Sequence, residues 1–389
     1  MLREIKDEPI PIKLWLNDIE PGALEQARNL ARLPFAFRHI ALMPDCHQGF
    51  GMPIGGVLAT KDVIIPNAVG VDIGCGMCAV QTSLHDIDQK TLKNIMADVR
   101  QLVPLGFKHH SKRQDERHMP ERQRLDNMPV VTREYDSATR QVGTLGGGNH
   151  FIEVQIGSDG QIWIMVHSGS RNIGKQVADY YNRLAIKLNE QWKSPVPKSA
   201  QLAWLPIDNK EGQQYLAEMN YCIDFALANR RLMMDNILSV FEKHFKGAFR
   251  AAPMINIAHN YASAEKHFGQ DLIVHRKGAT KANKDTTGII PGSQGASSYI
   301  VKGKGNPESF ESCSHGAGRK MGRKEAIRSL DLKKEIEKLD KKGIIHALRR
   351  AGDLEEASGA YKDIAVVMKN QDDLVDILVE LNPLAVIKG

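Results

Sequence analysis

The chain has few of the features that mark secreted, membrane or repetitive proteins. Its 389 residues include five cysteines, an odd number, and a chain of this length needs no disulfides to fold. No apolar run approaches the ~18 residues needed to cross a bilayer. The N-terminus, MLREIKDEPIPIK, is charged and lacks the apolar core of a signal peptide. These absences predict free thiols, a reducing cytoplasmic setting and no membrane partner.

Internal repeats and biased linkers are also absent, which favours one interleaved domain over several. Apolar residues make up 42% and charged residues 25% of the chain, so a sizeable core is possible. The net charge of +6 is compatible with a polyanionic ligand without requiring one. We therefore expect a single α/β (α+β) domain over residues 1–389.

Apolar periodicity and turn residues predict the elements of this domain. Helices are expected at 21–32, 88–103, 173–193, 210–247, 323–341 and 371–380. Strands are expected at 39–43, 56–59, 63–65, 161–167, 254–258, 272–274 and 385–389. The segment 107–140 is polar and crowded with Lys, Arg and His. We interpret it as a long loop or lid, either a solvated insertion or a loop that faces nucleic acid.

The most informative stretch is the glycine-rich turn at 69–77, VGVDIGCGM. It places Asp72 and Cys75 three residues apart at the end of an apolar run. A carboxylate and a thiolate are both metal ligands, and glycines let the backbone approach whatever these side chains hold. Cys78 completes a CxxC pair, but no second pair exists, so Cys78 and the helical Cys222 are predicted to be core residues.

Four later histidines each end an apolar run beside Gly, Asn or Ser: His150, His167, His259 and His315. A single histidine at a strand end is more often structural than a ligand. Several of them, converging with Asp72 and Cys75, would suffice for two metal ions that share a bridging ligand. Two-metal sites suit phosphoryl transfer. The Cys/His set favours Zn²⁺ on affinity, although carboxylate with imidazole also accepts Mn²⁺.

Two nucleotide-binding motifs can be set aside. Residues 169–175 fit GxxxxGK after a predicted strand, but Gln176 stands where a P-loop needs Ser or Thr. The lysine motif KxDG of nucleotidyl transferases is absent. If the protein forms a covalent nucleotide adduct, lysine in that motif is not the nucleophile.

His315 is the better nucleophile candidate. It lies between Ser314 and the glycines Gly316 and Gly318, where the backbone can crowd a phosphate. Imidazole can attack an activated phosphorus and leave again. Arg171 and Arg319 could neutralise phosphate charge. On residue type alone, the alternative is that His315 is another metal ligand or a turn residue.

At this point the chain resembles the RtcB family, the GTP- and Mn²⁺-dependent RNA ligases. The motifs that carry the resemblance occur in family order: 43–57 (MPDCHQGFGMPIGGV), 69–77, 146–150 (GGGNH), 167–171 (HSGSR), 259–261 (HNY), 275–280 (HRKGAT), 291–293 (PGS), 314–319 (SHGAGR), 361–363 (YKD) and 388–389 (KG). They span residue 43 to the end and are jointly specific.

The resemblance implies a fold and a reaction. The fold would be one domain built on β-sheets flanked by helices, with the active site in a central cleft. The enzyme would join an RNA 3′-phosphate, or a 2′,3′-cyclic phosphate after its hydrolysis, to a 5′-hydroxyl, in tRNA splicing or RNA repair. Its partners would be RNA with such ends and, in some members, the activator protein archease.

The resemblance also implies roles for individual residues. Two Mn²⁺ ions, in place of zinc, would be held by Asp72, Cys75, His150, His167 and His259, with Cys75 as the bridge. His315 would carry GMP as a histidine–guanylate, and Arg171 would meet the RNA phosphate. The remaining nucleotide contacts would come from Asn149, Glu153, Ser293, Gly316, Gly318, Tyr361 and Lys388. Asn149 would contact the guanylate phosphate, whereas Glu153, Tyr361 and Lys388 would hold guanine.

Two other functions use some of the same residues. A dinuclear metallophosphoesterase or nuclease would keep the metals and need no GTP. A non-catalytic protein that binds RNA ends would need neither.

Overall fold

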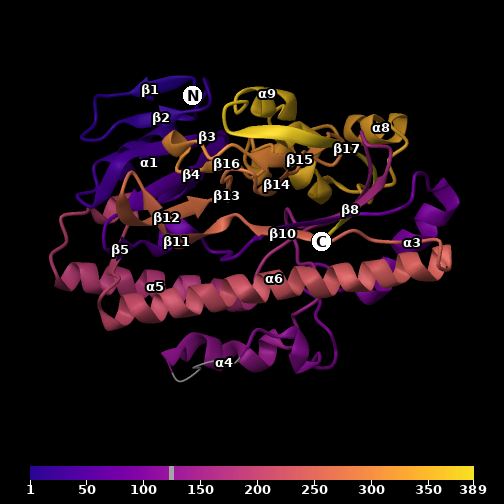
Figure 1. Ribbon diagram of the computed structural model, residues 1–389, viewed down its shortest axis with the longest axis horizontal. Helices are drawn as coiled ribbons and strands as arrows, with labels where there is room; N and C mark the ends of the chain where they lie inside the picture. The colour runs from indigo at the N-terminus through magenta and orange to yellow at the C-terminus, as the bar shows by residue number, and fades with distance from the viewer. Residues whose placement is uncertain (122–126) are drawn as a thin grey trace.

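The computed structural model describes residues 1–121 and 127–389, and two large β-sheets form its centre (Figure 1). The six-stranded sheet has the order β1-β2-β3-β4-β12-β11. Its strands are β1 (Arg3–Ile5), β2 (Ile12–Leu14), β3 (Ala36–Phe50), β4 (Met52–Thr60), β11 (Asn260–His267) and β12 (Gln270–Lys277). Only β2 and β3 run parallel in this sheet; the other neighbours are antiparallel.

The seven-stranded sheet is antiparallel and has the order β10-β6-β8-β7-β17-β15-β14. Its strands are β6 (Gly76–Gln81), β7 (Phe151–Gly157), β8 (Ile162–Ser168), β10 (Ile255–Ala258), β14 (Thr287–Ile290), β15 (Ser298–Gly303) and β17 (Val375–Lys388). Two small pairs complete the sheets: β5 (Val63–Ile64) with β9 (Leu205–Pro206), and β13 (Ala279–Lys281) with β16 (Ser312–Ser314).

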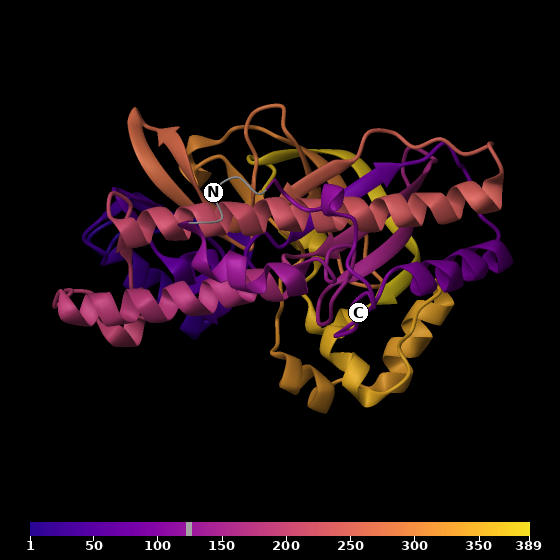
Figure 2. The same ribbon diagram turned by 90° about the horizontal axis from the view of Figure 1, so that it is seen from below.

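Helices cover these sheets. The longest two, α5 (Arg171–Gln191) and α6 (Lys210–Phe245), run side by side beneath them, with α4 (Pro129–Ala138) packed against both (Figure 1). The others are α1 (Pro21–Ala31), α2 (Pro66–Val69), α3 (Gln89–Leu102), α7 (Arg323–Ser329), α8 (Leu332–Lys341) and α9 (Ile364–Lys369). Short 3-10 turns lie at Glu116–His118, Lys198–Ala200, Pro307–Ser309, Ala351–Glu356 and Ser358–Ala360. Figure 2 shows α7 and α8 projecting below the sheets, near the C-terminus.

Local sequence explains where the long helices begin. The Asp88 side chain accepts hydrogen bonds from the backbone N–H groups of Lys90 and Thr91, and Asn209 caps α6 through the N–H of Gly212. Tyr215, Met219 and Cys222 lie one turn apart on the buried face of α6. The predicted core role of Cys222 is therefore confirmed.

Three sequence-based predictions are wrong or incomplete. The segment 107–140 is no continuous loop, because α4 begins at Pro129; within the predicted segment, residues 122–126 lie outside the described part of the chain. The predicted helix 323–341 is two helices, because the Asp331 side chain caps a second one through the N–H of Lys334. The predicted helix 371–380 is wrong: from Val375 the chain is strand β17, which pairs with β15 and β7.

The predicted α/β class and the central sheets are confirmed. All five cysteines are free and buried, as expected. Within the described ranges, no helix is both long and apolar enough to cross a membrane. The interpretation of residues 1–389 as one domain stays a prediction.

Candidate metal centre and nucleotide cavity

The turn between α2 and β6 carries Asp72 and Cys75, and its glycines are required by close packing. A Cβ on Gly74 would lie 2.9 Å from the Cα of Ile223 in α6, and one on Gly76 would lie 2.0 Å from the carbonyl oxygen of Ile257. Gly74 also has a φ of +75°, which L side chains rarely adopt. The glycine-rich sequence therefore lets the turn sit directly on α6 and β10.

All five predicted metal ligands meet at this turn. Their donor atoms form two groups, each within 4.8 Å: Asp72, Cys75 and His150, and Cys75, His167 and His259. The Cys75 Sγ lies 3.5 Å from the Nε2 of His150 and 3.3 Å from that of His167. The His167 and His259 Nε2 atoms are 3.4 Å apart. Cys75 is thus the donor common to both groups, in the position a bridging thiolate would take.

The surroundings orient two of these imidazoles toward the centre. His150 donates its Nδ1–H to the Leu145 carbonyl at 2.9 Å, and His167 donates its own to the Asn149 carbonyl at 3.1 Å. With Nδ1 engaged in this way, each Nε2 is directed at Cys75 and can present a lone pair to a metal ion. Burial lowers the pKa of His167 and His259 well below the usual value, which keeps both rings neutral.

The Asp72 carboxylate supplies the negative charge of the centre. Burial disfavours its ionisation, but the hydrogen bond and charge of His150, followed by the charge of Arg171, lower its pKa to about 2. Its Oδ2 lies 3.2 Å from the His150 Nε2 and its Oδ1 accepts the backbone N–H of Ser170 at 3.2 Å. A carboxylate, a thiol and three imidazoles fit one or two divalent transition-metal ions.

The same carboxylate fills the turn that resembles a P-loop. A Cβ on Gly169 would lie 2.2 Å from the Asp72 Oδ1, so this turn faces a protein carboxylate. Lys175 pairs instead with Asp179 at 2.5 Å on the surface of α5. The turn therefore belongs to the metal centre, in line with the exclusion of a P-loop.

His315 lies beside the metal centre and is oriented by a residue that the sequence did not single out. The fully buried Asp45 accepts the His315 Nδ1–H at 2.6 Å, and also the backbone N–H groups of His315 and Gly316 at 3.0 and 3.3 Å. The ring centroids of His315 and His259 are 4.8 Å apart. With its Nδ1–H donated to Asp45, His315 presents the Nε2 lone pair, the atom that a nucleophile needs.

Gly318 is fixed by the same arrangement. It has a φ of +72°, and a Cβ there would lie 2.2 Å from the Asp45 carbonyl oxygen. Burial opposes ionisation of Asp45, but His315 outweighs it and lowers the Asp45 pKa, so this partner is a carboxylate. The only local signal for Asp45 is its place in the 43–57 motif, because its contacts with His315 join residues 270 apart.

The eight predicted nucleotide-binding residues line one cavity of about 170 Å³, together with the candidate metal donors His167 and His259. These eight residues are Asn149, Glu153, Ser293, His315, Gly316, Gly318, Tyr361 and Lys388. A second hollow of about 450 Å³ shares Gln294, Glu356 and Lys388 with this cavity. We call the first space the nucleotide cavity. His47 and Arg323 also line it.

Strand pairing places the far wall of the nucleotide cavity. Lys388 ends β17 opposite Phe151 at the start of β7, and Glu153 follows two residues later. Glu153 is buried and accepts a hydrogen bond from the Gln155 Nε2 at 2.7 Å. Burial raises the pKa of Glu153 to about 8 and lowers that of Lys388. A buried acid and a buried amine thus face the same cavity.

Tyr361 and Arg319 are held together by Glu356, which the sequence also did not single out. Arg319 donates to the Glu356 Oε1 at 3.2 Å, and its Cζ lies 5.1 Å from the centroid of the Tyr361 ring. The Tyr361 hydroxyl donates to the other oxygen of Glu356. Arg323 reaches the same carboxylate at 3.1 Å. The arginine expected near phosphate is therefore paired with a buried carboxylate.

Arg171 lies outside the lining of the nucleotide cavity, on the side of Asp72. Its Nε donates to the Thr144 Oγ1 at 3.2 Å, and a Cβ on Gly146 would lie 2.2 Å from its Nη1. The glycines of the 146–150 motif thus leave room for this guanidinium.

Replacing Glu153 with glutamine is expected to stabilise the protein in a pH-dependent way. Because the pKa of Glu153 in the folded state, about 8, exceeds its ordinary 4.5, its contribution to stability is complete below pH 4.5 and is lost as pH rises toward 8. One pKa unit corresponds to about 1.4 kcal/mol, so the wild type should be less stable than Glu153→Gln by a few kcal/mol at pH 8.5. Thermal unfolding should show a Tm gain of a few degrees at pH 8.5 and almost none at pH 4.

The exposed Glu337 on α8 offers the matched control. Glu337→Gln should leave the pH dependence of Tm unchanged. An equal Tm gain for Glu153→Gln at both pH values would contradict the assignment.

The comparisons with known proteins decide the family. The family described as tRNA-splicing ligase RtcB matches residues 26–389. The chain belongs to the RtcB family. It is 38% identical to the RNA-splicing ligase RtcB of Escherichia coli strain K12, over 98% of each chain. It is 33% identical to the tRNA-splicing ligase RtcB of Nanoarchaeum equitans, over 98% of this chain and 95% of the relative. It is also 32% identical to that of Thermococcus kodakarensis, over 94% and 91%. The resemblance seen in the motifs is therefore confirmed.

Proposed function

We propose that this protein is an RNA ligase that uses GTP and Mn²⁺ to join an RNA 3′-phosphate or 2′,3′-cyclic phosphate end to a 5′-hydroxyl end. The observation that carries the proposal is the meeting of Asp45-oriented His315 with five metal donors and a nucleotide cavity. The relatives' names, RNA-splicing ligase and tRNA-splicing ligase, support RNA joining as the activity class. The enzyme would act in tRNA splicing or in the repair of broken RNA, and archease is a candidate activator.

The proposed reaction has three steps after any cyclic phosphate has been hydrolysed. First, the His315 Nε2 attacks the α-phosphorus of GTP, a P–N bond forms and pyrophosphate leaves. Second, an oxygen of the RNA 3′-phosphate attacks the same phosphorus and GMP passes from His315 to the RNA. Third, the RNA 5′-hydroxyl attacks the 3′-phosphorus, loses its proton and displaces GMP. His315 thus divides one difficult displacement into easier ones.

The residues of the nucleotide cavity have complementary roles in this proposal. Asp45 keeps the proton on the His315 Nδ1, so that Nε2 stays nucleophilic. In its ionised form Glu153 accepts from the N1–H and N2–H edge of guanine, Lys388 donates to the guanine carbonyl and the Tyr361 ring stacks on the base. The phosphate is contacted by the remaining residues, which are Asn149 and the turn residues Ser293, Gly316 and Gly318. Arg171 receives the RNA phosphate on the other side.

Two Mn²⁺ ions fit the two donor groups that share Cys75. When bound they would supply Lewis-acid stabilisation of charge on the attacking and leaving oxygens. The residues themselves also accept Zn²⁺, and affinity alone favours it. Mn²⁺ is therefore proposed because of the family resemblance, and the availability of each ion, rather than affinity, would select Mn²⁺ over Zn²⁺.

The test is ligation of a broken RNA with a 2′,3′-cyclic phosphate on one fragment and a 5′-hydroxyl on the other. With the metal-loaded protein, GTP should support joining and ATP should not, because adenine lacks the N1–H and carbonyl that Glu153 and Lys388 would recognise. GTP-independent release of phosphate without joining would favour the metallophosphoesterase instead. Binding of the ends with no reaction would favour an end-binding protein.

A further inference from the structure

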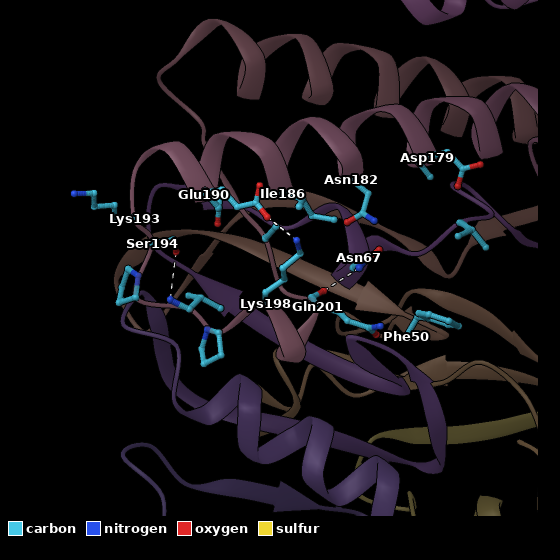
Figure 3. A pocket seen from close by; sticks show the side chains of 17 residues that line it. Phe50, Asn67, Asp179, Asn182, Ile186, Glu190, Lys193, Ser194, Lys198 and Gln201 are labelled. Carbon is cyan, nitrogen blue, oxygen red and sulfur yellow. Dashed lines mark hydrogen bonds and ion pairs between the residues drawn. The ribbon is translucent and has the colours of Figure 1, made fainter.

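A separate cavity, of about 670 Å³, lies beside α5 (Figure 3). One wall is α5, with Asn182 and Ile186; the opposite wall holds Asn67, Gln201 and, at one end, Phe50. We call it the Phe50 cavity. Among the described residues, it shares no lining residue with the nucleotide cavity. Its volume lies within the range of small-ligand sites, roughly 300–1,000 Å³.

Two chain segments connect the Phe50 cavity to the candidate active site. His47 and Ile54 pair across the β3–β4 hairpin and line the nucleotide cavity, whereas Phe50 at its tip lines the Phe50 cavity. Three residues of strand span about 10 Å. Val71, which lines the Phe50 cavity, directly precedes the metal donor Asp72. Phe50 is thus about 10 Å along the strand from His47, which lines the nucleotide cavity.

The backbone at the tip of the β3–β4 hairpin is anchored, although the side chain of Phe50 there is exposed to solvent. Phe50 is 69% exposed to solvent, and the nearby Val71 is 59% exposed. The buried Lys277 donates from Nζ to the carbonyls of Phe50 and Asn67 at 2.5 and 2.9 Å. Gly51 has a φ of +67°, and a Cβ there would lie 2.6 Å from the Gln201 carbonyl oxygen. A large aromatic surface is therefore presented to solvent on an anchored backbone.

The rest of the lining suits a flat, partly polar ligand. The Asn182 Oδ1 is buried and makes no hydrogen bond within the described residues. Such an acceptor needs a donor, for example an exocyclic amine of a base. Two lysines, Lys193 and Lys198, and two acidic residues, Asp179 and Glu190, also line the cavity. Lys198 pairs with Glu190 at 2.6 Å, Asp179 pairs with Lys175, and Lys193 is exposed. The lining thus combines an aromatic face, an amide edge and cationic groups, which are the elements of single-stranded nucleic-acid binding.

We propose that the Phe50 cavity binds a nucleobase of the RNA strand that supplies the 5′-hydroxyl. The inference rests on the proposed ligase function. In the joining step the 5′-hydroxyl must approach in line, opposite to the departing GMP. GMP leaves toward the nucleotide cavity, so the 5′-hydroxyl strand arrives from the side of Asp72, where the Phe50 cavity lies. At about 3.4 Å per stacked nucleotide, 10 Å places one of the first three or so bases in it.

The test combines Phe50→Ala with abasic nucleotides at positions 1 to 4 of the 5′-hydroxyl strand. For the metal-loaded, full-length protein, Phe50→Ala should leave GMP transfer to the protein and to the RNA 3′-phosphate unchanged. It should raise the KM for the 5′-hydroxyl strand at least about fivefold, the lower range of base–aromatic stacking. Phe50→Trp should restore it. With the wild type, an abasic nucleotide at one of these positions should raise the KM by a similar factor. With Phe50→Ala, the same abasic nucleotide should cause no further rise in KM.

Each other outcome has a distinct meaning. Equal losses for abasic strands in both proteins, or losses only with an abasic 3′-phosphate strand, would overturn the assignment. Unchanged KM in Phe50→Ala would also overturn it and leave the cavity to another occupant, such as a protein segment. Absence of GMP transfer in the wild type would refute the proposed function instead. Ile377→Ala, which removes an apolar side chain 53% exposed on β17, is the control and should change no step.

Discussion

Replacing Asp45 with asparagine should slow GMP transfer to His315 by up to about 10⁴-fold, the loss seen when a catalytic histidine loses the carboxylate that sets its tautomer. In the structure, one Asp45 oxygen accepts three N–H groups, including the His315 Nδ1–H at 2.6 Å. An amide can turn its NH₂ toward the ring and favour the tautomer with the proton on Nε2. That tautomer has no lone pair to attack phosphorus. Single-turnover transfer from α-labelled GTP measures the effect.

A matched control separates catalysis from folding. Asp373 accepts the indole N–H of Trp15 at 2.8 Å, far along the chain from His315. Asp373→Asn therefore removes a hydrogen-bonded carboxylate that does not contact His315 and should leave the transfer rate unchanged. A wild-type rate in folded Asp45→Asn would contradict the role of Asp45.

Replacing Cys75 with alanine should weaken both metal sites at once, because its sulfur is the one donor that both groups contain. His259→Ala should weaken one site, since His259 belongs to one group. Loss of a ligand should cost at least the factor of about 100 that loss of an outer-shell contact can cost. Mn²⁺ titration, followed by the signal of free Mn²⁺, should therefore give two ions for the wild type, one for His259→Ala and none for Cys75→Ala over the same range.

The Cys75 thiol also predicts a pH dependence. Burial, followed by the charge of Asp72, raises the pKa of Cys75 well above the usual value, so a bound ion must displace its proton. Mn²⁺ affinity should rise with pH up to about tenfold per unit. Cys78→Ser, which alters a buried thiol on β6, the strand that begins directly after Cys75, should keep two ions. Independent loss of one ion in Cys75→Ala would show that the sulfur does not bridge.

The residues that sequence reasoning identified share a local signature. Asp72, His150 and His167 end apolar runs beside glycine, asparagine or serine. The structure brings them around Cys75, with Asp72 in the turn before β6, His150 directly before β7 and His167 near the end of β8. Their convergence could be expected from residue types and from the family, but distances could not. The glycines were informative because Gly74 and Gly318 mark places where backbone meets backbone.

Asp45 and Glu356 were missed because their role depends on long-range contacts. Asp45 reaches His315 across 270 residues, and a buried aspartate in a strand has no periodic signal. Glu356 lies in a 3-10 turn and acts only through Arg319, Arg323 and Tyr361. Only the fold reveals such partners.

The misassigned elements have a similar cause. The stretch around 371–380 was predicted as helix, yet Val375, Ile377 and Val379 alternate along β17, where the chain pairs with β15. Ladder pairing with both neighbours outweighed local helix preference. For α4, Pro129 is a helix-start signal, and it was overlooked because the segment 107–140 is rich in charged residues.

The central claim is that His315 is the nucleophile that takes GMP from GTP. The most direct measurement is to incubate the Mn²⁺-loaded protein with α-labelled GTP and to map the label by peptide mass analysis. The account predicts one GMP per chain on His315, in a bond that is labile to acid and stable to alkali, and no label in His315→Ala. Label on a lysine, or full labelling of His315→Ala, would contradict it.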